Sequence, residues 1–146
     1  VVAMYGTCWH DTAQRTDVWT DGSATTTGLR RAGAGVFWGI YHERNVSVRV
    51  PGESQTNNHA ELYAVLCAIR MAKPARTLRI HTDSQYAIHS VCHWAARFSQ
   101  LGWRHANSDL IRTIANHIRA RTAPVQFYWI KGHAGNVHNE HADQLA

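Results

Sequence analysis

The sequence predicts an α/β domain in which helices flank a mixed β-sheet. Three observations support this prediction. The first third of the chain consists of short apolar stretches bounded by Gly and polar turns, a pattern typical of strands. One longer stretch, residues 59–73, repeats apolar residues at helical spacing. Strand-like and helical stretches then alternate, and a strand meander followed by α/β units produces both antiparallel and parallel pairs.

The first three strands are predicted to form the meander. The first ends at Asp21-Gly22, a common turn pair, and the second and third are joined by the short polar stretch "HERN". We expect these strands at residues 17–20, 33–41 and 46–50. Residues 1–16 are predicted to be an irregular extension, so the folded domain is expected to span 17–146.

The rest of the chain predicts helices and two further strands. The helix at 59–73 follows an N-cap at Thr56 or Asn57 and is stopped by Pro74. A strand with period-two alternation runs up to Asp83. The other elements are expected as short helices at 84–91 and 94–101, a helix with Leu110, Ile111, Ile114 and Ile118 on one face, a strand at 125–130, a loop at 131–137 and a helix from Asn139. The predicted order is β-β-β-α-β-α-α-α-β-α.

Composition indicates a single folded domain. The chain has 146 residues, of which 45% are hydrophobic and 17% charged, and it contains no repeat, linker or low-complexity tract. No apolar run approaches the roughly 18 residues of a membrane helix and no secretory signal is visible, so no membrane association is expected. Three cysteines without CxxC spacing argue against a zinc knuckle or a disulfide framework, and suit a reducing, intracellular compartment.

The charge balance is basic. Fifteen Lys and Arg against ten Asp and Glu give a net charge of +5, with eleven His in addition and a pI near 9.5. A polyanion such as nucleic acid is therefore a reasonable partner, but charge alone does not decide whether there is one.

Four acids are candidates for a shared site. Asp21 and Asp83 each end a predicted strand, Glu61 lies in the first turns of the long helix, and Asp143 lies in the last helix. Each also has an ordinary explanation: Asp21 as a turn residue, Glu61 as a favourable charge at a helix N-terminus, and Asp143 as solvated helix surface. Distance along the sequence does not show whether the four meet in space.

A resemblance to a known family brings the four acids together. The stretches "WTDGSA", "QTNNHAELYAVLCAI", "IHTDSQYAI" and "WIKGHAGNVHNEHADQLA" resemble the successive signature blocks of the type 1 ribonuclease H family, in that family's order and approximate spacing. Each block carries one of the acids, and a GHxG loop precedes the last acid by ten residues. The resemblance covers about residues 17–146.

The resemblance implies a five-stranded mixed sheet and an endonuclease that cuts the RNA strand of RNA–DNA hybrids, giving 5′-phosphate and 3′-hydroxyl products. It makes Asp21, Glu61, Asp83 and Asp143 the metal-binding carboxylates. Four converging acids repel one another unless cations neutralise them. Two Mg²⁺ ions about 3.5–4 Å apart, with Mn²⁺ as a substitute, are the expected cofactors. His133, in the GHxG loop, matches a family histidine that assists proton transfer or product release.

The resemblance also points to contacts with the hybrid. Polar side chains near the acids are expected to read the minor groove and the 2′-hydroxyl groups of the RNA strand. Trp103 belongs to a segment, residues 92–107, that is similar to the DNA-gripping handle of cellular family members. The expected substrate-binding residues are Gly22, Ser23, Thr56, Asn57, Asn58, Gln85, Trp103, Asn107 and Asn139.

The chain departs from the family pattern in its weakly basic handle. Only Arg97 and Arg104 are permanent cations there, and Ser54 stands where eukaryotic members often have arginine. A hybrid-binding module with weak hydrolysis is therefore a second hypothesis. A third is a ribonuclease H domain of a retroelement polyprotein, linked to a reverse transcriptase, because the chain lacks an initiator Met and its last helix is short. Monomers are expected in every case.

Overall fold

The protein is described by a computed structural model that covers residues 2–3, 15–25, 30–40, 42–52, 54–94, 107–132 and 137–146. A single mixed sheet runs through the described part of the chain, in the order β1-β6-β5-β2-β3-β4. Its strands are β1 (Val2–Ala3), β2 (Arg15–Ala24), β3 (Ala32–Phe37), β4 (Val46–Arg49), β5 (Thr77–Thr82) and β6 (Val125–Trp129). The helices are α1 (Asn57–Met71), α2 (Gln85–His89), the π-helical turn η1 (Ser90–Trp94), α4 (Ser108–Arg119) and α5 (Val137–Leu145).

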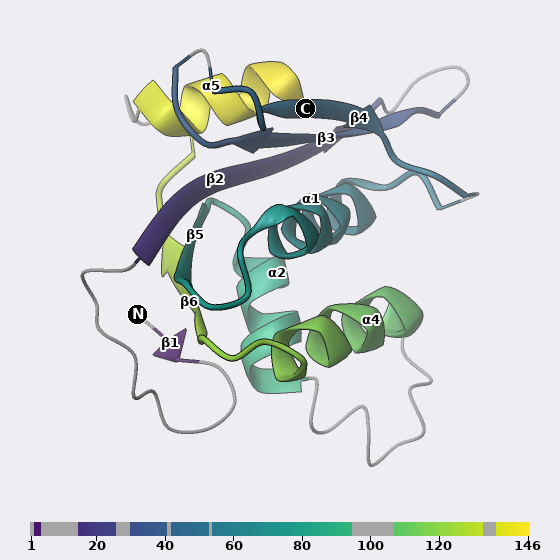
Figure 1. Cartoon of the computed structure of the whole chain (residues 1–146). Helices are drawn as coiled ribbons and strands as arrows, with labels where there is room; N and C mark the ends of the chain where they lie inside the picture. The colour runs from purple at the N-terminus through teal and green to yellow at the C-terminus, as the bar shows by residue number, and fades with distance from the viewer. Residues whose placement is uncertain are drawn as a thin grey trace.

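Helices cover the sheet on both sides (Figure 1). The helices α1, α2 and α4 lie on one side of β2, and α5 lies on the other. The meander β2-β3-β4 is antiparallel, whereas β2, β5 and β6 are parallel to one another. The predicted α/β class with a mixed sheet is therefore confirmed, with the two-residue strand β1 added at the edge of the five longer strands.

The first strand is longer than predicted. It starts at Arg15, and it continues through Asp21 and Gly22, which pair with Gly35 and Ala34 of β3. The prediction that Asp21-Gly22 is a turn is therefore wrong. Glycine is required here because α1 passes directly over the strand: a Cβ on Gly22 would lie 2.3 Å from the backbone of α1. The N-terminal stretch also differs from an irregular extension, since Val2–Ala3 pair with β6.

The long helix forms where it is predicted, with its bounds shifted by two residues. Of the two candidate N-caps, Thr56 is the one used, because its hydroxyl accepts a hydrogen bond from the His59 amide at 3.2 Å. The helix buries its predicted apolar face, Leu62, Val65, Leu66 and Ile69, against the sheet. Burying each such side chain contributes about 1.5–3 kcal/mol. This packing fixes α1, and therefore Glu61, relative to β2.

The other predicted helices differ from the observed ones in where they begin and end. The last helix begins at Val137, two residues before the predicted start. The helix predicted at 84–91 divides into α2 and η1, and most of the helix predicted at 94–101 lies outside the described residues. Cys67 and Cys92 are free and half-buried. Among the described residues, no helix combines the length and apolar character needed to span a bilayer.

Candidate active site

Three carboxylates converge at one end of the sheet. Asp21 comes from β2, Glu61 from α1, and Asp83 directly follows β5. One oxygen from each lies within 4.8 Å of the other two. The two aspartates meet because β2 and β5 are adjacent parallel strands that run toward the same end of the sheet.

Glycine at position 22 allows Glu61 to reach this cluster. A Cβ there would lie 2.3 Å from the carbonyl carbon of Ala60 and 2.3 Å from the amide nitrogen of Glu61. Both are backbone atoms, so neither can move away as a flexible side chain would. Any side chain at position 22 would separate α1 from β2, and with it Glu61 from Asp21.

A second glycine brings the fourth acid from the opposite face. Gly35 is paired with Asp21 in the β2–β3 register, so the two residues share a face of the sheet. A Cβ on Gly35 would lie 2.3 Å from the carbonyl oxygen of Ala142, in α5. This close approach brings Asp143, the next residue of α5, near Asp21, but Asp143 is not among the carboxylates whose oxygens lie within 4.8 Å of one another.

The site is buried and acidic, which disfavours negative charge on it. Burial raises the pKa of Asp21 to about 7; the Glu61 side chain and the Gly22 amide lower it, while Asp143 and Asp83 raise it. The Gly22 amide donates to Asp21 Oδ1 at 2.9 Å. Burial, followed by the charge of Asp21, raises the pKa of Glu61 to about 10. Without a compensating positive charge, the cluster therefore retains protons near neutral pH.

The donor set fits a hard divalent cation. Glu61 Oε2 is buried and has no hydrogen-bond partner among the described residues. A buried carboxylate oxygen without a partner is unfavourable unless it binds a proton or a cation. All ligand atoms in the cluster are carboxylate oxygens, which suit Mg²⁺ or Mn²⁺ better than softer metals.

The comparisons with known proteins identify the family. The RNase H family model matches residues 13–146. Ribonuclease H1 of Homo sapiens is 36% identical over 137 residues, which cover 88% of this chain and 48% of the human protein. Ribonuclease H of Bordetella pertussis is 35% identical over 143 residues, which cover 91% of this chain and 87% of the bacterial protein. This chain belongs to the RNase H family.

Two solved structures support the same assignment at the level of the fold. The crystal structure titled LC9-RNase H1, a type 1 RNase H with the type 2 active-site motif, superposes with a TM-score of 0.74 at 27% identity, over 91% of this chain and 70% of that one. A foamy viral protease-reverse transcriptase, solved in complex with dsDNA, superposes with a TM-score of 0.72 at 21% identity and shares the fold. The chain spans about half the length of the mammalian and fission-yeast relatives that it matches.

Two predicted site residues of this RNase H domain, His133 and Trp103, lie outside the described residues. The beginning of the GHxG loop is described, and it lies against the acids. A Cβ on Gly132 would be 2.5 Å from Asp83 Oδ2. Gly132, the residue before His133, therefore lies directly beside Asp83.

The predicted substrate residues fall into three groups. Gly22 and Ser23 are part of β2, beside the acids. The exposed start of α1 carries Thr56, Asn57 and Asn58. Gln85, Asn107 and Asn139 lie at the start of α2, before α4 and in α5, respectively, and of these Asn139 is buried, with 2% of its surface exposed.

Several of these side chains are held in place by the fold. Asn57 Oδ1 accepts a hydrogen bond from the Ala24 amide at 2.7 Å, which ties the start of α1 to the end of β2. Asn107 has a left-handed backbone conformation, with φ 64°, and its Nδ2 donates to the Tyr86 hydroxyl at 3.1 Å. Its Oδ1 lies 2.9 Å from His59 Nδ1.

The sequence analysis did not identify His59 and Tyr86 as site residues. His59 joins two of the predicted substrate-binding residues: its amide donates to the Thr56 hydroxyl, and its ring nitrogen Nδ1 is hydrogen-bonded to Asn107 Oδ1. No spacing in the sequence indicates this arrangement, because the three residues come from different segments. The polar character of His59, two positions before Glu61, was the only available signal.

Proposed function

We propose that this RNase H domain hydrolyses the RNA strand of RNA–DNA hybrids, giving 5′-phosphate and 3′-hydroxyl ends. The observation that carries the proposal is the cluster of the buried Asp21 with the partly buried Glu61 and Asp83, in which a buried Glu61 oxygen lacks a partner among the described residues. One oxygen from each of the three carboxylates lies within 4.8 Å of the other two, as a cation site requires.

Asp21, Glu61, Asp83 and Asp143 would hold two Mg²⁺ ions, with Mn²⁺ as a substitute. When bound, such ions activate the attacking water and stabilise the charge that develops on the leaving 3′ oxygen. The chain itself supplies the fixed positions of the carboxylates, since α1 approaches β2 closely at Gly22 and α5 approaches β3 closely at Gly35. His133 would transfer protons to or from the reacting groups or assist product release.

Substrate selection would come from polar groups around the acids. Asn57, Asn58 and Gln85 lie at exposed helix starts, where they can contact the minor groove, and only the 2′-hydroxyl distinguishes RNA from DNA locally. The linkage between Thr56 and Asn107 through His59 would bind a phosphate of the DNA strand. Asn139 would contact the hydroxyl beside the scissile phosphate.

The experiment compares matched labelled RNA–DNA, RNA–RNA and DNA–DNA duplexes, each with Mg²⁺ and with EDTA. We expect cleavage of the RNA strand of the hybrid alone, and only with Mg²⁺. Asp83→Asn is the matched control, because it keeps the size of the side chain and removes its charge. A hybrid that is bound but not cut by the parent protein would favour the binding-module hypothesis. Cleavage of all three duplexes would refute hybrid specificity.

Three predictions about the context of the domain are untested. These are an intracellular location, a monomeric state, and a covalent link to a reverse transcriptase in a longer precursor. The reverse-transcriptase chain that shares this fold is consistent with the last, but at 21% identity it does not carry the proposal.

A further inference from the structure

A second pocket lies at the opposite end of β2 and α1 from the acids. It has a volume of about 590 Å³. Arg15, on its rim, is six residues before Asp21 along the strand, a separation of roughly 20 Å at about 3.3 Å per residue. The helix α1 ends at Met71, ten residues after Glu61, roughly 15 Å at about 1.5 Å per residue, and Lys73 follows two residues later. The cationic side of the pocket therefore lies away from the acids, whereas Trp19 and His138, which also line the pocket, lie closer to them.

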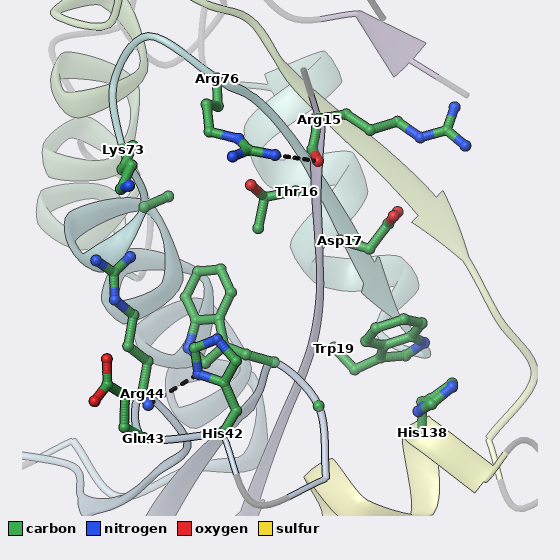
Figure 2. A pocket seen from close by; sticks show the side chains of 13 residues that line it. Arg15, Thr16, Asp17, Trp19, His42, Glu43, Arg44, Lys73, Arg76 and His138 are labelled. Carbon is green, nitrogen blue, oxygen red and sulfur yellow. Dashed lines mark hydrogen bonds between the residues drawn. The ribbon is translucent and has the colours of Figure 1, made fainter. Parts of the chain in front are cut away.

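The pocket exists because β3 is shorter than β2. Pairing between them ends at Trp19 and Phe37, so residues 15–18 of β2 pair with β5 on one side and with no described strand on the other. The open side is lined by Trp38, Gly39 and residues 42–44, after β3, and by Ala72, Lys73 and Arg76, after α1. Figure 2 shows the labelled ones, His42, Glu43, Arg44, Lys73 and Arg76, on that side of β2.

Three cations line this open side of β2. Figure 2 shows Arg44, Lys73 and Arg76 on the same side of the strand as Thr16, whereas the Arg15 side chain extends to the other side. None of the three forms an ion pair with a described carboxylate. The lining holds two acids: Asp17, which is 3.0 Å from His81, and Glu43, next to Arg44 in the wall. With three cations against Glu43, this side of the pocket keeps an excess of positive charge.

Backbone carbonyls hold these cations in position. Arg44 Nη1 donates to the Met71 carbonyl oxygen at 3.2 Å, and Arg76 Nη2 donates to that of Arg15 at 3.2 Å. Arg121 Nη2 in turn donates to the carbonyl oxygens of Lys73 and Arg76, at 3.2 and 2.6 Å. A guanidinium has five N–H donors, so each arginine of the wall retains donors for a ligand. These hydrogen bonds fix the positions of the arginines. Because the acceptors are uncharged carbonyl groups, the positive charges of the arginines remain.

A buried donor in the lining is also without an acceptor. Trp38 is 9% exposed and lines the pocket, and its indole Nε1 has no hydrogen-bond partner among the described residues. A buried indole N–H usually finds an acceptor, and indole offers no acceptor of its own. This N–H is covered by protein atoms, so the three cations of the wall, and not the indole, indicate a ligand that is anionic and rich in acceptor oxygens.

We propose that this pocket binds a phosphate-bearing ligand, independently of the candidate active site. Phosphate groups match the cationic wall better than a single carboxylate does, because they offer more acceptor oxygens to the arginine forks and the lysine. The volume is in the range of pockets for compact ligands, about 300–1,000 Å³. The phosphate can belong to a free polyphosphate or nucleotide, or to a nucleic-acid strand. The proposal goes beyond hybrid cleavage and does not depend on it.

The test measures binding of sodium tripolyphosphate to the full chain by calorimetry in EDTA, so that no cleavage occurs. Lys73→Gln removes one cation of the wall at an exposed residue whose side chain makes no described hydrogen bond. Arg112→Gln removes one exposed cation of α4, outside the pocket, and is the matched control. We expect saturable binding that Lys73→Gln weakens roughly three- to tenfold, whereas Arg112→Gln changes it less than about twofold.

Two further arms identify the source of the phosphate. ATP and a short single-stranded oligonucleotide are titrated as competitors of tripolyphosphate. Competition by ATP alone would assign free phosphate compounds, and competition by the oligonucleotide would assign a strand. Absence of saturable tripolyphosphate binding, or equal weakening by Lys73→Gln and Arg112→Gln, would overturn the proposal. Hybrid cleavage is measured separately, and Lys73→Gln should leave it unchanged. The calorimetry therefore tests the phosphate pocket, and the cleavage assay tests the proposed function.

Discussion

In the absence of divalent cations, the free energy of unfolding should fall as the pH rises, because the site buries several acids together. Asp21 is 4% exposed, and burial raises its pKa from 3.8 to about 7. In the unfolded chain this pKa returns to about 4. Between those values the folded state keeps a proton that the unfolded state has released. The stabilisation is therefore complete below about pH 4 and is lost as the pH rises toward 7.

The size of the effect follows from the same difference in pKa. A difference of about three, at about 1.36 kcal/mol for each pKa unit, corresponds to about 4 kcal/mol from Asp21 alone. This is a large fraction of the roughly 5–15 kcal/mol by which a domain is stable. Glu61, whose pKa burial and the charge of Asp21 raise to about 10, acts in the same direction and extends the loss above pH 7.

The assay is urea unfolding in EDTA, followed by circular dichroism between about pH 5 and pH 8, for the parent protein and Asp21→Asn. Asparagine keeps an acceptor for the Gly22 amide and removes the charge. We expect the variant to gain up to about 4 kcal/mol relative to the parent across this range. Mg²⁺ at about 100 times its Kd should add about 2.7 kcal/mol to the parent, and less to the variant. Parallel pH dependences for the two proteins in EDTA would refute the reasoning.

Four further predictions concern single residues. Asp83→Asn should reduce hybrid cleavage by orders of magnitude, with an unchanged circular dichroism spectrum and an equal or higher melting temperature in EDTA, because it relieves repulsion. His133→Ala should lower kcat by about 10²–10⁴-fold at most, less than Asp83→Asn does, and equal losses would mean that it holds the site together. Gly22→Ala should destabilise the fold by about 3 kcal/mol or more in urea unfolding, because its Cβ would lie 2.3 Å from the backbone of α1. Trp103→Ala should raise KM more than it lowers kcat and leave the salt dependence of binding nearly unchanged, whereas early melting with normal binding would make it an anchor of the handle.

The individual helices and strands could be predicted from the sequence better than the contacts between them. The periodicity of α1 is local, so its buried face could be read directly. Gly22 was interpreted as a turn residue, because the reason for a glycine there is the passage of a helix that begins 35 residues later. Local patterns carry no information about such a crossing. The left-handed conformation of Asn107 was equally invisible, since its partners His59 and Tyr86 come from other elements.

The acids of the site were likewise found by resemblance and not by local pattern. Asp21, Glu61 and Asp83 are spread over more than 60 residues, and each has an ordinary local explanation. Only the register of β2 with β5 and the contact of α1 with β2 bring them within 4.8 Å. Periodicity can place each residue on a strand or helix, whereas convergence is a property of the sheet order, which the family resemblance supplied.

Contacts between side chains of α5 and the sheet help to hold this helix in position. Two histidines of this helix pack on aromatic residues of the sheet. His141 stacks on Phe37, with ring centroids 4.8 Å apart and 8° between the planes, and His138 lies tilted by 35° against Trp19, with centroids 4.3 Å apart. Aromatic pairs of this kind contribute about 0.5–1.5 kcal/mol each beyond their buried area. These contacts hold α5 on the sheet whether or not a cation is bound. Loss of cleavage in EDTA should therefore reflect the loss of the cations themselves, with α5 still docked, and not the unfolding of this helix.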